Sequence, residues 1–535
     1  MNKSRTLAIL LLSMALITIA QTMPKNIKKL LNAQYAISAF YVDSVNEDKI
    51  VEDAIKGILK DLDPHSTYTT AAETKELDEP LQGSFSGIGI QFHMNQDSLY
   101  VIQTVAGGPS ERVGILAGDR IITVNDTLIA GVKMSTNDIK KRLRGIEGSK
   151  VEVKVKRGKS PDLITFRVTR EKIPLYSIDA SYMIDKNTGY VKIARFAAST
   201  NEEFVNAIDS LKRIGMKQLI IDLTDNGGGY LNSAIEMGNE LLDRGNMIVY
   251  TEGRTSPRNE AKALGNGKFR NGKVAVLVNQ YSASASEIFS GAVQDWDRGV
   301  VVGRRSFGKG LVQRPLQFED GSMIRLTVAR YYTPSGRCIQ KPYKLGDRLD
   351  YDMDILNRYK DGELSNVDSI HHFADSLRVS TLKNKRTIYG GGGIMPDVFV
   401  PLDTTEYSDY YRDLVAKGII VQYCLNYVDQ HRKQLKQQYA DVAAFDNHFT
   451  VDEQMEKDII AAGDADSVKY DADQYAKSKN LIKNIMKALI ARDTYSDPSA
   501  YFMVMNHTNP IVKQALDILN DDRRYQSIIS GKAQK

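Results

Sequence analysis

The chain is poor in the residues that cross-link small folds or hold structural metals. Its 535 residues include only two cysteines, Cys338 and Cys424, and seven histidines. Two cysteines so far apart predict neither a disulfide framework nor a zinc motif. A bridge between them and two free thiols both stay open. We therefore expect no metal site and a fold that depends on hydrophobic cores.

The sequence also lacks a strong excess of charge of either sign. Its 71 basic and 66 acidic residues leave a net charge of +5, and the two kinds are interspersed. Proteins that bind nucleic acid usually concentrate Lys and Arg on one face or stripe. We therefore expect no nucleic-acid partner. The length predicts three or four domains of about 100–200 residues each.

Long apolar runs are absent except near the N-terminus. There, Lys3 and Arg5 precede an apolar run of 14 residues from Leu7 to Ala20. A helix needs about 20 apolar residues to span a bilayer. A basic start and a short apolar centre predict a secretory signal over residues 1–22, hence a periplasmic or secreted protein with peripheral or no membrane association. An uncleaved membrane anchor is the alternative.

Two regions with different residue patterns follow the predicted secretory signal, or leader. Over residues 23–80 the apolar spacing predicts helices, with a break at Pro64 in "DLDPHSTY". Residues 81–173 contain short strand patterns between glycine and Asn/Asp turns. One helix lies among them, in "STNDIKKRLRG", with Ser135 or Thr136 as its N-cap. We expect a compact domain of five or six strands and a helix.

The second half predicts a layered core and a helical end. Residues 174–403 alternate strand patterns such as "KQLIIDLTDN" and "GKVAVLVNQ" with helical ones such as "NEEFVNAIDSLKRIG" and "YLNSAIEMGNELLDRG". This alternation predicts an α/β core. Within it, residues 341–390 are polar and poorly patterned, as in a long surface insertion. Residues 404–535 are helical and charged. The whole is expected to be a multidomain α+β protein.

The stretch "GRRSFGKGLVQ" comes within one residue of the nucleotide-binding loop G-x-x-x-x-G-K-[ST]. That loop needs a Ser or Thr after its lysine to ligate magnesium, and Gly310 stands there instead. It also needs a helix after the lysine, whereas "GLVQRPLQF" favours a strand. Both departures argue against nucleotide binding and leave the role of Lys309 open.

A better partner for this lysine lies upstream. "VLVNQYSASASEIFSGAVQDW" predicts a buried strand, a turn of small residues and a helix. This order is typical of a nucleophile elbow, although the G-x-S-x-G form is absent. The turn alone does not choose among Ser282, Ser284 and Ser286. Ser286, directly before Glu287, also suits a helix N-cap.

A serine nucleophile needs a base, and the α/β motifs contain no histidine. His371 and His372 fall in the polar insertion, so a Ser-His-Asp arrangement is unsupported, though not excluded. A Ser-Lys pair is the alternative. Lysine has an ordinary pKa of about 10.4, so burial must lower its pKa before it can act near neutrality. The apolar and glycine neighbours of Lys309 favour such burial, and a solvated loop lysine is the plain alternative.

Taken whole, "SASASEIFSGAVQDWDRGVVVGRRSFGKGLVQ" resembles the signature of the C-terminal processing (tail-specific) proteases, the S41-type carboxyl-terminal peptidases. The resemblance implies a ClpP/crotonase-like α/β core and no cofactor. It implies Ser284 as the nucleophile, Lys309 as its base at the family spacing, and Gln313 as the residue that orients the lysine.

The resemblance extends to "DLTDNGGGYL", where the family usually has N-P-G-G. Gly227 replaces the proline here, which suggests a more flexible loop. Backbone amides in this segment and after the nucleophile form the family's oxyanion hole. The resemblance therefore implies Gly228 and Ala285 as donors, with Gly229 as the alternative to Gly228.

The strand-rich region resembles a PDZ domain of the kind these proteases carry, through "GIGI" and "GPSERVGILAGDRIITVND". This implies that Gly87, Ile88, Gly89 and Ile90 bind the terminal carboxylate of a protein tail, which adds a strand to the sheet. The function implied is a serine endopeptidase that recognises C-terminal tails.

Two other functions stay open: a non-catalytic tail-binding protein of the same fold, and a Ser-Lys hydrolase of a non-peptide amide or ester. The helical ends predict a homo-oligomer, with plain intramolecular packing as the alternative.

Overall fold

The computed structural model describes residues 24–532, apart from residues 96, 106, 159, 367, 368 and 370–374. The predicted leader lies outside this range. The chain forms two units: Met1–Ala72, Gln313–Thr327 and Tyr343–Asp352 make unit 1, and Glu73–Val312, Val328–Pro342 and Met353–Lys535 make unit 2. Among the described residues, no helix combines the length and apolar character needed to cross a membrane.

Unit 1 contains the first two described helices, α2 (Lys25–Phe40) and α3 (Glu47–Lys60). The Asn46 side chain caps α3 by accepting the Lys49 N–H at 3.0 Å. After Pro64 the chain forms β1 (Thr67–Thr69), which pairs antiparallel with the first residues of β18 (Met323–Tyr332). The predicted helices and the break at Pro64 are confirmed.

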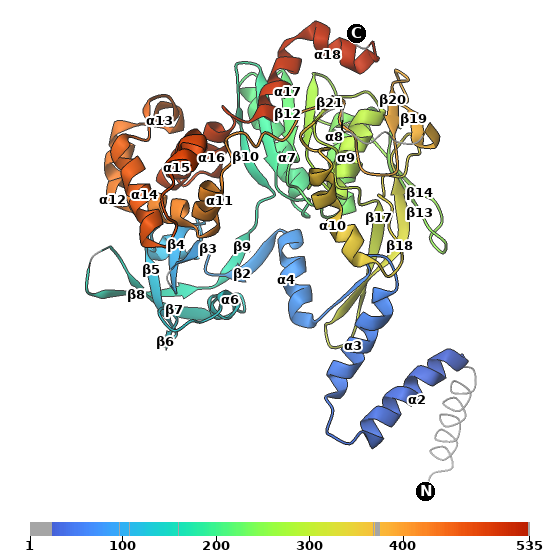
Figure 1. Ribbon diagram of the computed structural model, residues 1–535, viewed down its shortest axis with the longest axis horizontal. Helices are drawn as coiled ribbons and strands as arrows, with labels where there is room; N and C mark the ends of the chain where they lie inside the picture. The colour runs from blue at the N-terminus through green and yellow to red at the C-terminus, as the bar shows by residue number, and fades with distance from the viewer. Residues whose placement is uncertain are drawn as a thin grey trace. The chain divides into compact units, whose positions relative to one another are not determined.

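The centre of unit 2 is a six-stranded sheet in the order β10-β11-β12-β15-β16-β21 (Figure 1). Strands β11 to β21 are parallel, and β10 is antiparallel to β11. Parallel strands that are buried on both faces are apolar along their whole length, which explains "VAVLV" in β15. The strands are β10 (Ile178–Met183), β11 (Thr188–Ile193), β12 (Gln218–Asp222), β15 (Val274–Val278), β16 (Val300–Gly303) and β21 (Val398–Phe399).

Alternate residues of these strands enter two different hydrophobic layers, as the two-residue period of a strand requires. Val274 and Val276 pack with α7 (Thr200–Arg213), α8 (Leu231–Leu241) and α9 (Ala285–Asp295). Ala275 and Leu277 pack with α17 (Pro510–Asn520) and α18 (Asp522–Ser530). The last two described helices of the chain therefore cover the second face of the core sheet.

The predicted strand-rich domain is a six-stranded antiparallel sheet in the order β3-β4-β5-β7-β8, with β6 beside β5. Ser135 caps its helix α6 by accepting the Asp138 N–H at 3.1 Å, which settles the predicted cap. The elements, with the flanking pair β2 and β9, are β2 (Ser84–Gly87), β3 (Ile90–Asn95), β4 (Ser98–Thr104), α5 (Pro109–Val113), β5 (Arg120–Val124), β6 (Thr127–Leu128), α6 (Thr136–Leu143), β7 (Lys150–Lys156), β8 (Leu163–Thr169) and β9 (Glu171–Pro174).

Helices α11 to α16 form a separate hydrophobic core, which includes Cys424. Both cysteines are free thiols, so the alternative of two free thiols is confirmed over a disulfide between them. The helices are α11 (Asp409–Ala416), α12 (Ile419–Gln438), α13 (Val442–His448), α14 (Glu453–Ala465), α15 (Ala472–Tyr495) and α16 (Pro498–Met505).

The polar segment 341–390 is more than the predicted surface insertion, because Arg358 and Glu363 within it are buried at 4% and 5% exposure. The remaining elements, those of this segment included, are α4 (Ala71–Gln82), β13 (Met247–Glu252), β14 (Asn259–Lys262), β17 (Leu311–Gln317), α10 (Arg348–Lys360), η2 (Asp375–Leu377), β19 (Arg378–Ser380) and β20 (Thr387–Tyr389).

Candidate active site

Ser284 occupies the sharp turn between β15 and α9, where it is the residue directly before the helix. Its backbone has φ 56° and ψ −113°, a combination that costs energy for any residue with a Cβ. Its side chain is only partly buried. The strand, the strained turn and the helix follow in the order that the sequence predicted, which is typical of a nucleophile elbow.

The hydroxyl groups of the two neighbouring serines donate to backbone carbonyls. Ser282 is buried and donates its hydroxyl to the Leu223 carbonyl at 2.7 Å. Ser286 is buried and donates to the Asn226 carbonyl at 2.9 Å. Ser286 is therefore not the helix N-cap, because α9 begins at Ala285. Of the three serines in the turn, Ser284 alone combines strain with exposure.

Glu287 joins the serine turn to the loop of Lys309. The Ser284 N–H and the Lys309 N–H each donate to its Oε2 at 2.8 Å. The Gly308 N–H donates to its Oε1 at 2.7 Å, and so does the Ser306 hydroxyl at 2.5 Å. Complete burial raises the pKa of Glu287 above its ordinary value, although all four donors oppose the shift.

Tyr331 joins the same two segments through their carbonyls. Its hydroxyl lies 3.1 Å from the backbone carbonyl oxygen of Ser284 and also contacts the backbone carbonyl oxygen of Lys309. Lys309 itself is half-buried, and the chain after it enters strand β17, as the sequence predicted. Within unit 2 the structure thus brings Ser284 and Lys309 together through Glu287 and Tyr331.

A buried ion cluster fixes the loop before Lys309. Arg305 forms a bidentate pair with Glu363, at 2.7 and 2.6 Å. Arg358 also pairs with Glu363, at 2.9 Å, and donates to the carbonyls of Arg305 and Ser306 at 2.7 and 3.1 Å. Two paired guanidinium groups around one carboxylate satisfy charges that burial would otherwise penalise. Arg358 and Glu363 of the predicted polar insertion therefore hold in place the loop that leads to Lys309, which we call the lysine loop.

Gln313 lies on β17, in the part of that strand that belongs to unit 1. Its amide nitrogen donates to the Thr327 hydroxyl at 3.2 Å. Thr327 in turn donates to Asp63 Oδ1 at 2.8 Å. The predicted orienting glutamine is thus itself held by two polar side chains of the same unit.

Gly228, a predicted oxyanion donor, lies directly against the nucleophile turn. A Cβ added there would lie 2.8 Å from the Ser284 Cβ and 3.0 Å from the Ala285 nitrogen. Its φ of +101° also favours glycine. The Gly228 N–H donates to Asn226 Oδ1 at 2.8 Å. The two predicted donors, Gly228 and Ala285, are therefore neighbours. The Gly228 N–H already has an acceptor within the protein, the Asn226 side chain.

The predicted tail-binding residues end β2 and begin β3. The Ile88 carbonyl accepts from the Ser110 N–H and hydroxyl at 3.1 and 2.6 Å, and the Gly89 carbonyl accepts from the Val105 N–H at 3.0 Å. In a planar trans peptide the following N–H points the opposite way. The amides of Gly89 and Ile90 therefore point away from these partners, as a carboxylate site requires.

A groove of about 470 Å³ lies between β3 and α6 beside these amides. Its lining is mainly apolar. It is lined by Phe85, Ile88, Gly89, Ile90, Gln91, Phe92, His93, Met94, Thr136, Lys140, Leu143 and Arg144. Three of the four predicted tail-binding residues, all but Gly87, line it.

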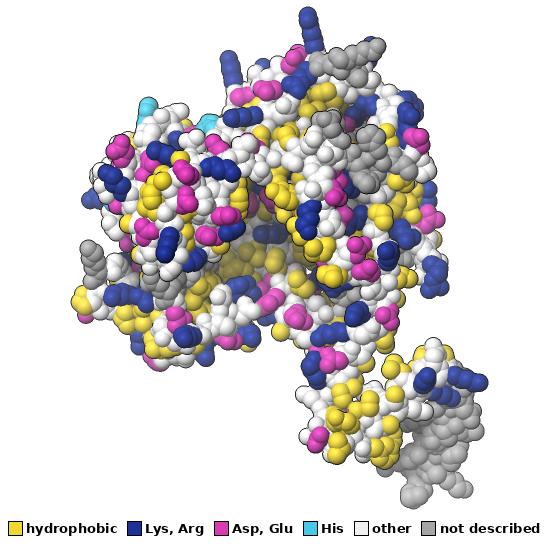
Figure 2. Space-filling model, viewed as in Figure 1, with side chains coloured by type: hydrophobic (Ala, Val, Ile, Leu, Met, Phe, Trp, Pro, Cys, Tyr) yellow, Lys and Arg dark blue, Asp and Glu magenta, His cyan; other side chains and the backbone are white. Residues whose placement is uncertain are grey.

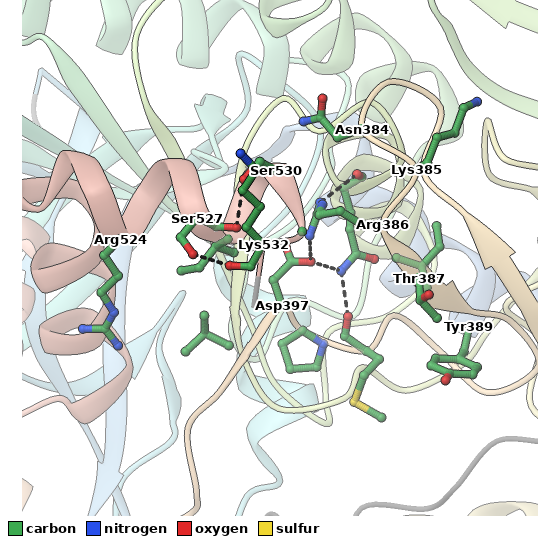
Figure 3. A pocket seen from close by; sticks show the side chains of 17 residues that line it. Asn384, Lys385, Arg386, Thr387, Tyr389, Asp397, Arg524, Ser527, Ser530 and Lys532 are labelled. Carbon is green, nitrogen blue, oxygen red and sulfur yellow. Dashed lines mark hydrogen bonds and ion pairs between the residues drawn. The ribbon is translucent and has the colours of Figure 1, made fainter. Parts of the chain in front are cut away.

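A second cavity, of about 610 Å³, contains none of the predicted site residues (Figure 3). In it Arg386 donates to Asp397 at 2.5 Å and to Asp297 at 2.6 Å. The Asn384 amide donates to the Ile529 carbonyl of α18 at 2.8 Å. The Asn384 bond fastens α18 to the core, whereas the Arg386 pairs join segments of the core to one another.

Sequence reasoning missed Glu287 and Tyr331. A Glu three residues after Ser284 matches the S-x-x-E spacing of a helix capping box, which was the available signal. Tyr331 left no local signal, because its role depends on where β18 lies. His371 and His372 lie outside the described residues, so the Ser-His-Asp alternative is untested.

Comparison with known proteins agrees with the resemblance drawn from the sequence. Family models match for peptidase family S41 over residues 187–353, a PDZ domain over 86–168, the N-terminal domain of the activating protease CtpB over 13–74, and a family of unknown function over 410–496.

The carboxy-terminal processing protease CtpA of Bacillus subtilis is 34% identical over 353 residues, which cover 64% of this chain and 75% of the relative. A probable CtpA-like serine protease of Staphylococcus aureus is 32% identical, over 67% of this chain and 71% of its own. The solved photosystem II D1 C-terminal processing protease is 30% identical and covers 59% of this chain and 91% of its own, with a TM-score of 0.33.

Substitution of Gly228 by alanine should lower kcat/KM at least about tenfold, because the strained backbone and the close contacts each cost on the order of 1–3 kcal/mol. Gly227→Ala is the matched control, since a Cβ there has no atom within 4 Å. Steady-state kinetics of both variants tests this. Equal activity of the two would contradict the role of this close contact.

Glu287→Gln should lower kcat at least about tenfold, since hydrogen bonds to a charged acceptor contribute about 1.5–3 kcal/mol each and the new amide NH2 would face an N–H or hydroxyl donor. The melting temperature should fall as well. Kinetics with circular dichroism on the same sample separates lost catalysis from lost folding. An unchanged kcat would show that the carboxylate does not set the geometry.

Proposed function

Since the chain belongs to peptidase family S41, the carboxy-terminal processing serine proteases, and carries a PDZ domain, we propose that Ser284 is its nucleophile, Lys309 its base and Gln313 the residue that holds the lysine. The observation that carries this proposal is the strained, half-exposed Ser284, whose backbone Glu287 joins to that of Lys309. Strain of this kind persists where the surroundings over-determine it, and it clusters at active sites.

In the proposed reaction the neutral Lys309 amine takes the Ser284 proton while the serine oxygen bonds to the scissile carbonyl carbon. The amides of Gly228 and Ala285 donate to the oxyanion, at about 3–4 kcal/mol per donor. For this, the Gly228 N–H exchanges its bond to Asn226 for the oxyanion.

The second half of the reaction reverses these roles. Lys309 gives its proton to the leaving amine, and the carbonyl stays bonded to Ser284 as an ester. A water molecule then attacks this ester, with Lys309 taking the water proton and returning it to the serine oxygen. The scheme uses no metal and no cofactor.

We propose protein and peptide C-terminal tails as the substrates. The groove beside Gly87, Ile88, Gly89 and Ile90 supports this, because its lining is mainly apolar and the N–H groups of its loop point away from the partners of the loop carbonyls. A tail bound as an added strand would place its carboxylate at these amides. The protein cut upstream of its tail is then processed or degraded.

We propose the periplasm or the cell exterior as the place of this activity. The support is the sequence pattern of residues 1–22, which predicts a signal peptide. An uncleaved anchor from the same segment is the alternative. In either case the catalytic unit would meet its substrates outside the cytoplasm.

The second candidate function is a non-catalytic tail-binding protein of the same fold. Such a protein needs the groove between β3 and α6, but it has no need of a strained serine at residue 284. The strain at Ser284 and its link to Lys309 through Glu287 therefore favour the enzyme. A Ser-Lys hydrolase of small amides or esters would need the serine turn but not the groove.

The test is cleavage of a loosely folded protein substrate that ends in apolar residues. Ser284→Ala and Lys309→Ala should each lower kcat/KM by about 10³-fold or more, as removal of a catalytic nucleophile or base does. Lys262→Ala, at an exposed lysine of β14, is the matched control and should cleave normally. Mass spectrometry of the products checks each variant.

The same substrate with an amidated C-terminus separates tail recognition from chemistry. We expect weaker binding and slower cleavage, because an amide lacks the charge that the loop amides would recognise. Cleavage by Lys309→Ala at the wild-type rate would overturn the assigned base. Binding of the tail without cleavage by the wild-type chain would favour the non-catalytic protein.

We also propose that the N-terminal helices join two copies of the chain. Apolar side chains gather on α2 and α3 (Figure 2), and α2 buries none of its residues. Leu30, Leu31, Tyr35 and Phe40 are 47–78% exposed on it. An isolated helix of this length is marginal in water, and a second α2 offers matching apolar chemistry to cover these side chains.

Leu31→Glu should convert a dimer into a monomer in light scattering of the chain from residue 23 onward, because it would bury a charge in that interface. Lys29→Glu, which places the same acidic side chain at a polar position of the same helix, is the control and should leave the mass unchanged. A monomeric wild-type chain at tens of micromolar would contradict this proposal.

A further inference from the structure

The segment "DLDPHSTY" forms a tight polar turn in unit 1, and its centre is Asp63. The Asp63 carboxylate accepts the N–H groups of His65 and Ser66 at 3.0 and 3.1 Å. It also accepts the Ser66 hydroxyl at 2.5 Å. This is the local pattern by which an Asp side chain holds the turn that follows it. The side chain is 9% exposed, so these bonds lie away from bulk water.

Thr327 of strand β18 fastens the turn to that strand. The Thr327 hydroxyl donates to Asp63 Oδ1 at 2.8 Å. The Thr327 N–H donates to the Ser66 hydroxyl oxygen at 3.1 Å. Both the backbone and the side chain of Thr327 are therefore fixed by the turn, although 264 residues separate Asp63 and Thr327 in the sequence.

Thr327 then fixes the amide of Gln313. A threonine hydroxyl has one proton, and here the proton goes to Asp63, so the oxygen can only accept from its next partner. The partner is the Gln313 amide nitrogen, at 3.2 Å. This determines which end of the amide faces Thr327. The Gln313 carbonyl oxygen is consequently directed away from the threonine.

The direction of these bonds matches what the proposed reaction asks of Gln313. A lysine that acts as a base must keep its nitrogen lone pair for the serine proton, so its own N–H groups need an acceptor. An amide oxygen can accept, and an amide NH2 cannot. Gln313, Thr327 and Asp63 thus form a relay, in which Gln313 donates to Thr327, Thr327 donates to Asp63, and the Asp63 carboxylate accepts.

We propose that Asp63 and Thr327 are positioning residues of the catalytic apparatus, which hold Gln313 with its carbonyl oxygen available to the Lys309 amine. This inference rests on the proposed function, in which Gln313 holds Lys309. It gives the "DPHSTY" segment a role in the reaction, whereas a turn at the end of α3 would otherwise be a local structural feature.

The experiment measures kcat and KM of the full chain on the tail-bearing protein substrate. Thr327→Val removes the hydroxyl and keeps the shape, and we expect kcat to fall about tenfold, the effect of one lost polar contact. KM should change less than about twofold, because Thr327 is not among the residues that line the tail groove. Thr327→Ser should recover most of kcat. Thr69→Val, at another threonine of the β1–β18 pair, is the matched control.

The decisive comparison is made in a Gln313→Ala background. If Thr327 acts through Gln313, Thr327→Val should cost nothing further there, whereas a structural defect would cost the same tenfold again. Additive losses would therefore overturn the inference. Should Thr327→Val fail to fold, Thr327→Ser and Thr327→Ala supply the same comparison, since they differ by one oxygen atom.

The outcomes separate this inference from the proposed function. If wild type and Lys309→Ala cleave equally, the proposed function fails and the relay has no lysine to serve. If Lys309→Ala is inactive and Thr327→Val is as active as wild type, the proposed function stands and the relay is wrong. If Lys309→Ala is inactive and the Thr327 and Gln313 losses are not additive, both stand.

Discussion

The carboxylate of Glu287, fully buried at the start of α9, accepts hydrogen bonds from the backbone of Ser284, Gly308 and Lys309 and from the Ser306 hydroxyl. Moving a carboxylate out of water costs several kcal/mol unless hydrogen bonds replace the lost hydration. Four donors do so here, and each belongs to one of the two segments that must meet. The strained turn and the lysine loop therefore cannot shift independently of this one side chain.

A second buried carboxylate, that of Glu363, helps to hold the same loop. Glu363 pairs with Arg305 and Arg358, and Arg358 also donates to the backbone of the residues before the lysine loop. Removal of the Glu363 carboxylate would take this counter-charge from both guanidinium groups in the interior. The loop is thus held on both sides by carboxylates, one through backbone amides and one through guanidinium groups. Precise placement of Lys309 is compatible with glycines on both sides of it because of these anchors.

The sequence was sufficient to predict the core strands β12 and β15, because parallel strands buried on both faces are apolar throughout. It also predicted that a strand follows Lys309 and that Ser135 caps α6. The choice among the serines of the turn depends on their backbone angles. The sequence does not reveal these angles, because the three serines simply alternate with alanines. The assignments of Ser284, Lys309, Gln313 and the oxyanion donors remain predictions.

Other features depend on contacts between residues remote in sequence. A polar pattern predicts surface, because charged side chains are rarely buried unless paired, and the pairing of Glu363 with Arg305 is not visible from either residue alone. In the same way, Thr327 is an ordinary strand residue until Asp63 lies beside it. Glu287 had a local signal, but that signal indicates only a helix start.

The covering of the core sheet by α17 and α18 has a consequence for how the protein is made. Strands β10 to β16 are synthesised and can pair long before residues 510–530 exist, yet one face of their sheet remains apolar and bare until those helices arrive. Burial of that face stabilises the fold by about 25 cal/mol per Å². A chain from which these helices are still missing therefore has an incomplete core, so the serine turn gains a fully covered sheet only once residues 510–530 have been made.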